Sequence, residues 1–93
     1  MIVIGTVSEV AAISGRGVAL FFESSPTHIA QFLNLTVLIS RPDGSVSSFS
    51  ASREFARKVG APGGEVITLL LRGASAAQVP VGSVVKVAVA SGA

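Results

Sequence analysis

Apolar residues along this chain come in short runs separated by turn-forming residues, which is typical of strands rather than helices. The clearest run spans residues 33–40, where every second residue is large and apolar: Leu33, Leu35, Val37 and Ile39. A period of two places these side chains on one face of a half-buried strand. The following segment, Arg41 to Ser45, has the composition of a type I turn, so residues 33–51 are predicted to form a hairpin.

The rest of the chain repeats this arrangement. Runs rich in Val, Ile and Leu predict further strands over residues 2–13 (with a bend at Gly5), 18–22, 66–71 and 83–90. In the last of these, Val85, Val87 and Val89 share one face, with Lys86 on the other. Glycine, proline and serine predict turns over residues 14–17, 24–27, 60–64 and 79–82. Residues 28–32 could form a short helical turn, and residues 91–93 are expected to fray.

About six short strands and no long helix predict an all-β fold, a single antiparallel β-barrel domain over residues 1–93. Closing the sheet removes the exposed edges that such strands would otherwise offer for aggregation. In composition, 49% of the residues are hydrophobic and only 13% are charged. These charged residues are too few to cover the surface of a small protein. We therefore expect apolar surface to be covered by a second copy or by another protein.

Several chemistries are not expected. The net charge of +2 is too weak to indicate nucleic acid by itself, and without cysteine there is no disulfide or thiolate chemistry. No GxxxxGK[ST] motif occurs, so GTP binding is not expected. The single His28 and the scattered carboxylates do not suggest a metal or catalytic site. The sequence predicts a non-enzymatic, cofactor-free, cytoplasmic protein that does not bind membranes.

The densest charge cluster is the most functional-looking part of the chain. It comprises Arg53, Glu54, Arg57 and Lys58 around Phe55, and the turn over residues 60–64 follows it. The cluster could bind RNA, because cations combined with an aromatic ring suit single-stranded nucleic acid. It could equally be a solvated strand edge whose ion pairs contribute little.

Three pieces of sequence resemble the second domain of the elongation factor Tu family of translational GTPases. They are the turn Ile13-Ser14-Gly15-Arg16-Gly17, the element Arg53-Glu54-Phe55-Ala56-Arg57-Lys58, and the strand Val66 to Gly73 with its Leu-Leu-Leu-Arg-Gly ending. They occur in the family's order, and Val79 to Val85 resembles the family's closing strand. The segment over residues 20–30 departs from the family pattern.

The resemblance implies a six-stranded translation-factor β-barrel. In that family a Glu and an Arg, matching Glu54 and Arg57 here, line a pocket for the aminoacylated 3′ end of tRNA. Positions three apart on a strand face opposite sides, so a bend or bulge would be needed to bring these two together. Arg16, retained in the turn motif, and Arg72 also have a plain structural interpretation, covering apolar surface with their stems.

Two functional hypotheses follow. The first is a non-catalytic protein-interaction module that self-associates or docks onto a GTPase-like partner, which low charge and high apolar content favour. The alternative is an RNA module for the tRNA acceptor end, using Arg53, Arg57 and Lys58. Salt dependence separates them, because phosphate binding weakens steeply with ionic strength.

Overall fold

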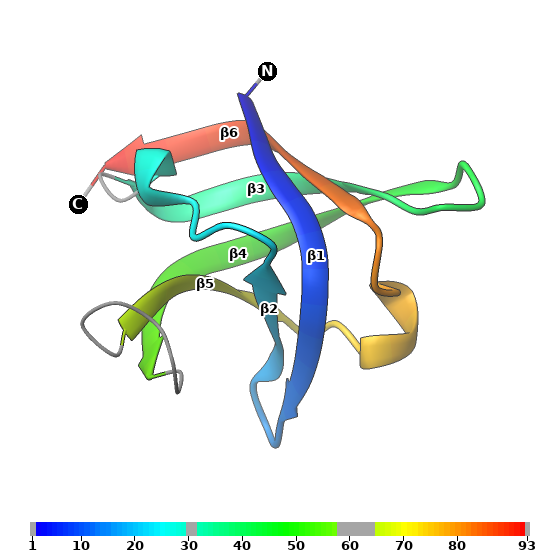
Figure 1. Ribbon diagram of the computed structural model, residues 1–93, viewed down its shortest axis with the longest axis horizontal. Coiled ribbons are helices and arrows are strands. Elements are labelled where there is room, and N and C mark those ends of the chain that lie inside the picture. The colour runs from blue at the N-terminus through cyan, green and yellow to red at the C-terminus, as the bar shows by residue number, and fades with distance from the viewer. Residues whose placement is uncertain (1, 30–31, 58–64, 93) are drawn as a thin grey trace.

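The structure is a computed structural model that describes residues 2–29, 32–57 and 65–92. It confirms the all-β prediction: within these residues, strands in the order β1-β2-β5-β4-β3-β6 form a closed antiparallel barrel (Figure 1). The strands are β1 (Ile2–Ile13), β2 (Gly17–Phe22), β3 (Phe32–Ser40), β4 (Val46–Arg57), β5 (Glu65–Arg72) and β6 (Val84–Gly92). Two 3-10 turns, η1 (Thr27–Ile29) and η3 (Ala76–Gln78), connect them.

The two longest strands, β1 and β4, each pair mainly with one neighbour along their first part and with the other along their second part. The N-terminal part of β1 pairs with β6 and its C-terminal part with β2, and the register shifts near Gly5, where the bend was predicted. In the same way β4 pairs first with β3 and then with β5. Because β4 continues without interruption to Arg57, its charged end belongs to the sheet.

The inward-facing side chains of all the strands fill the barrel and form its core. Its fully buried large members are Val7, Val18, Leu20, Ile29, Val37, Ile39, Leu69, Leu71, Val79 and Val85. The predicted alternation holds for Leu35, Val37 and Ile39, which are buried, whereas Leu33 is 39% exposed. Leu33 lies at the start of β3, where the register with β6 is irregular, so it extends past the core.

The turn between β3 and β4 forms as predicted. The Gly44 N–H donates to the Arg41 carbonyl (2.9 Å), as in a four-residue turn. The Ser45 hydroxyl and N–H both donate to Asp43 Oδ1 (2.6 and 2.9 Å), and these bonds hold the Asp43 pKa below its usual value. The Arg41 guanidinium donates to the Gln78 carbonyl (2.7 Å), which ties this turn to η3.

One expectation about the C-terminal third was wrong. Ser91 and Gly92 are not a frayed tail, because they continue β6 and pair with the start of β3. The connection after β5 contains the 3-10 turn η3. The Gln78 side chain closes this turn by accepting from the Ser75 N–H (2.8 Å). In the described part of the chain no helix is long and apolar enough to span a membrane.

Candidate functional site

The charged cluster lies on the C-terminal half of β4, and the sheet divides it between two faces. The pairing of β4 with β5 runs from Ala51 to Arg57 without a bulge, so successive side chains alternate. Arg53 and Phe55 pair with Leu69 and Ile67, which belong to the core, and so lie on the barrel's inner side. Glu54 lies on the outer side. The structure therefore does not bring Glu54 and Arg57 together.

On the outer side, Glu54 instead binds Arg16. The Arg16 Nη2 lies 2.6 Å from Glu54 Oε2 and its Nη1 lies 3.5 Å from Oε1, while the Ser52 hydroxyl lies 3.4 Å from Oε2. Arg16 comes from the β1–β2 turn and reaches across β5 to β4, since β5 lies between β2 and β4 in the sheet. The motif arginine and the motif glutamate thus form one cluster.

Gly17 holds the β1–β2 turn close enough to β5 for this contact. Its φ is +134°, and a Cβ added there would lie 2.0 Å from the Leu71 carbonyl oxygen. The Gly73 N–H also donates to the Arg16 carbonyl (3.3 Å). Only a residue without a side chain allows the two backbones to approach this closely.

A pocket of about 340 Å³ lies beside the ion pair on the outer face. Its lining consists of Gly15, Arg16, Ser52, Leu70 and Arg72. We call it the outer pocket. Leu70 faces away from the barrel core, since its neighbours Leu69 and Leu71 face into it, yet it is only 3% exposed. Its burial supports the interpretation that Arg16 and Arg72 cover apolar surface with their stems.

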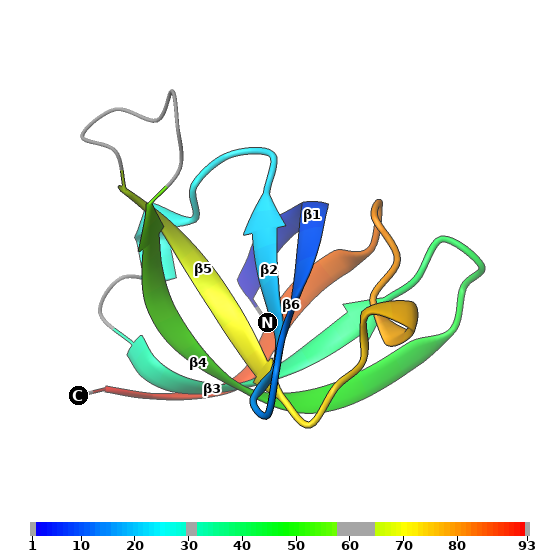
Figure 2. The ribbon, with the colours of Figure 1, turned by 90° about the horizontal axis from the view of Figure 1, so that it is seen from below.

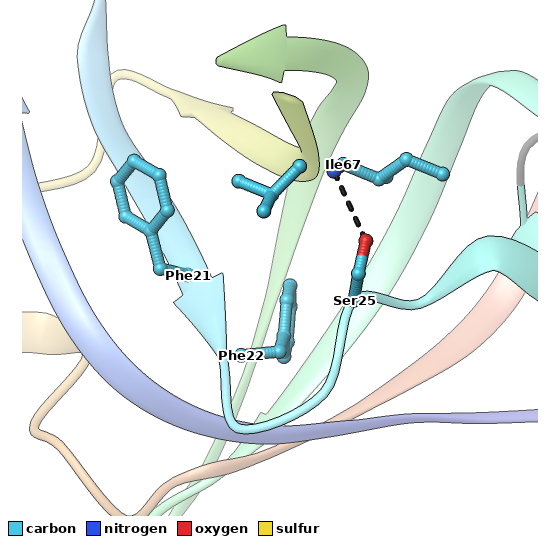
Figure 3. A pocket seen from close by; sticks show the side chains of 5 residues that line it. Phe21, Phe22, Ser25 and Ile67 are labelled. Carbon is cyan, nitrogen blue, oxygen red and sulfur yellow. Dashed lines mark hydrogen bonds between the residues drawn. The ribbon is translucent and has the colours of Figure 1, made fainter. Parts of the chain in front are cut away.

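On the inner side, β4 and β5 extend past the paired part of β2, and Figure 2 shows them diverging from it. Where these strands diverge, a small pocket of about 30 Å³ is lined by Phe21, Phe22, Ser25, Val66 and Ile67 (Figure 3). The Ser25 hydroxyl accepts a hydrogen bond from the Ile67 N–H (3.2 Å), which replaces a strand partner for β5 at this point (Figure 3).

Phe55 is the most exposed aromatic side chain at this end of the barrel among those described, with 58% of its surface accessible. The Arg53 guanidinium lies over its ring, 5.2 Å from the centroid, and Arg53 Nε is buried with no hydrogen-bond partner among the described residues. Arg57 follows on the same face and is exposed, as is Glu23 in the loop after β2. We call Glu23, Arg53, Phe55 and Arg57 the mouth surface.

Sequence reasoning located part of these sites. It named Arg16, Arg53, Glu54 and Arg57, but it did not associate Arg16 with Glu54, and it missed Ser52. For Arg72 the sequence suggested only a structural role. Its place beside Arg16 could have been predicted if the Gly-Arg-Gly turn and the Leu-Arg-Gly strand end had been taken as neighbours, which the pairing of Gly17 with Arg72 shows them to be. Lys58 and the turn over residues 60–64 lie outside the described residues, as does the side chain of His28.

The chemistry available here is recognition by charge, hydrogen bonds and apolar contact. Within the described residues, no three or more His, Cys, Asp or Glu side chains cluster as they would to hold a metal ion. Guanidinium groups in the outer pocket can bind carboxylates or phosphates, and an exposed ring under an arginine can enter an apolar pocket.

The Arg16–Glu54 ion pair is expected to contribute little stability, because its side chains are 55% and 33% exposed. Exposed pairs contribute about 0–1 kcal/mol. We expect a double-mutant cycle with Arg16→Gln and Glu54→Gln to give a coupling free energy below about 1 kcal/mol in urea unfolding. A coupling above about 2 kcal/mol would show that the pair organises the fold.

No protein-family model, curated protein or solved structure matches this chain. The resemblance to the second domain of the elongation factor Tu family therefore stays a prediction from three motifs and their order.

Proposed function

We propose that this chain is a non-catalytic β-barrel module, similar to a translation-factor second domain, that associates with protein through its mouth surface, and that its partner is a second copy of itself. The observation that carries the proposal is Phe55, a large aromatic side chain left 58% exposed yet positioned by the Arg53 guanidinium. Aromatic and arginine side chains are the residues that most often dominate the energy of protein interfaces.

Charge complementarity favours a second copy. The same end of the barrel carries two arginines, Arg53 and Arg57, and an exposed carboxylate, Glu23. In a two-fold contact each surface meets itself, so the arginines of one copy can face Glu23 of the other while the two Phe55 rings pack centrally. The low charged fraction of 13% is also what an associating protein would show.

RNA binding at the tRNA acceptor end is the alternative, and it has less support. Arg53 and Arg57 lie on one face of β4, but the carboxylate that would complete the family's pocket, Glu54, lies on the other face and is paired with Arg16. The exposed carboxylate of Glu23 at this end of the barrel also disfavours a phosphate backbone.

The solution mass of the purified chain tests the proposal. Light scattering at low and high salt, with and without total tRNA, should give a dimer that persists at high salt, because the central contact is apolar, and that tRNA does not change. A monomer at the highest soluble concentration contradicts self-association. A monomer that gains mass with tRNA at low salt and loses it at high salt supports the RNA alternative.

Phe55→Ser should convert the dimer to a monomer at concentrations where the wild type is dimeric. Val46→Ser is the matched control, because Val46 is also exposed (56%) but lies at the other end of β4. Losing an aromatic anchor from an interface centre costs at least about 2 kcal/mol, or about thirtyfold in Kd. Equal dissociation constants for both variants would place the interface elsewhere.

A further inference from the structure

We propose that the outer pocket is a binding site for a small oxyanion, a carboxylate or a phosphoryl group carried on a small molecule. This goes beyond the association proposed for the mouth surface, because the pocket lies on the opposite face of β4 and β5. At about 340 Å³ it is at the lower end of the range of small-molecule sites.

The donors in this pocket exceed the acceptors that the protein supplies. Arg16 and Arg72 both line it, and Glu54 beside it accepts from Arg16 and from the Ser52 hydroxyl. Arg72 has no acceptor among the residues that the structure describes. Arg72 is exposed, and its guanidinium group carries five N–H donors in a planar fork that matches an oxyanion, so these donors are available to such a ligand.

The Arg16–Glu54 pair positions the site rather than neutralising it. Arg16 and Arg72 both line the pocket and Glu54 supplies one carboxylate beside it, so its net charge is positive. The carboxylate holds the Arg16 fork in place through the 2.6 Å contact, which lowers the entropy lost when a ligand binds. The turn at Gly15 leaves the pocket open to a ligand, since among the described residues no atom lies within 4 Å of a Cβ built on Gly15.

The base of the pocket defines the rest of the ligand. The arginine stems that cover Leu70 offer apolar contact, and the Ser52 hydroxyl, 3.4 Å from Glu54 Oε2, offers a polar one. A ligand that combines an oxyanion with a small apolar body fits this lining better than a bare ion does. Inorganic phosphate and benzoate are therefore suitable probes for the two oxyanion chemistries.

Amide chemical shifts of the ¹⁵N-labelled chain measure this binding at constant ionic strength. Titration with benzoate, and separately with phosphate, should shift the Gly15, Arg16 and Gly73 amides in a saturable way for at least one probe. Saturation by benzoate alone indicates a carboxylate ligand, and saturation by phosphate alone a phosphoryl ligand. Shifts that rise linearly for both probes would overturn the site.

Two substitutions distinguish binding at the outer pocket from a general effect of the protein's positive charge. Arg72→Gln should weaken binding at least about tenfold, the effect of losing a charge-assisted hydrogen bond. Lys86→Gln removes the same charge from β6 and should change binding less than about twofold. Equal effects of the two variants would contradict the proposal. Phe55→Ser should leave this titration unchanged whether or not it disrupts the dimer.

Discussion

Gly17→Ala is expected to lower the free energy of unfolding by about 3 to 5 kcal/mol, a large part of what a domain of this size has. The new Cβ would lie 2.0 Å from the Leu71 carbonyl oxygen, and backbone atoms cannot move aside as a flexible side chain would. The φ of +134° adds a second cost, because residues with a Cβ rarely adopt this conformation. Backbone strain and overpacking each cost about 1–3 kcal/mol.

Gly15→Ala is the control for the clash. Gly15 also has a positive φ, +77°, but a Cβ there meets nothing within 4 Å. We expect a loss of only about 1–2 kcal/mol, the cost of the left-handed conformation alone. Urea unfolding followed by far-UV circular dichroism gives both values, since the chain has no Trp or Tyr for fluorescence. Equal losses would show that the close approach of the turn to β5 does not contribute.

The same close approach shows how far local sequence can predict this fold. The alternation over residues 33–40 and the turn at Pro42-Asp43-Gly44 predicted the β3–β4 hairpin, because period-two patterns and turn residues act locally. Strand pairing between distant segments has no such local signal. Ser91 and Gly92 were expected to form a frayed tail after the last strand, yet Phe32 and Asn34, far away in sequence, supply their partners.

The candidate sites depend even more on pairing between distant segments. Alternation alone predicted that Glu54 and Arg57 would lie on opposite faces, and the uninterrupted register of β4 confirms it. The contact of Arg16 with Glu54 could not be predicted in this way, because it requires β2, β5 and β4 to be neighbours in that order. The outer pocket likewise combines the β1–β2 turn, β4 and β5.

Leu70 illustrates why burial itself was only partly predictable. A run of apolar residues over 66–71, bounded by turn residues, indicated a buried strand. The structure agrees, but for two different reasons: Leu69 and Leu71 enter the barrel core, whereas Leu70 is buried on the outer face, in the outer pocket lined by Arg16 and Arg72. The composition of the strand does not distinguish these two kinds of burial.

The core side of this strand gives the second large effect. Leu69 is completely buried on β5, between its pairing partners Leu20 on β2 and Arg53 on β4. Replacing it with alanine removes apolar contacts and leaves a cavity that strands fixed by pairing on both sides cannot close. We expect Leu69→Ala to lower the free energy of unfolding by about 2–5 kcal/mol.

The matched control is Leu33→Ala, the same chemical change at a position that is 39% exposed, for which we expect a loss below about 1 kcal/mol. Both variants should be compared by urea unfolding at one protein concentration, because association at the mouth surface would add to the apparent stability. If Leu69→Ala costs no more than Leu33→Ala, the barrel interior is not a close-packed core. A large loss at Leu69 together with normal dimerisation of the folded fraction would show that the core and the mouth surface, although both on the inner side of β4 and β5, act independently.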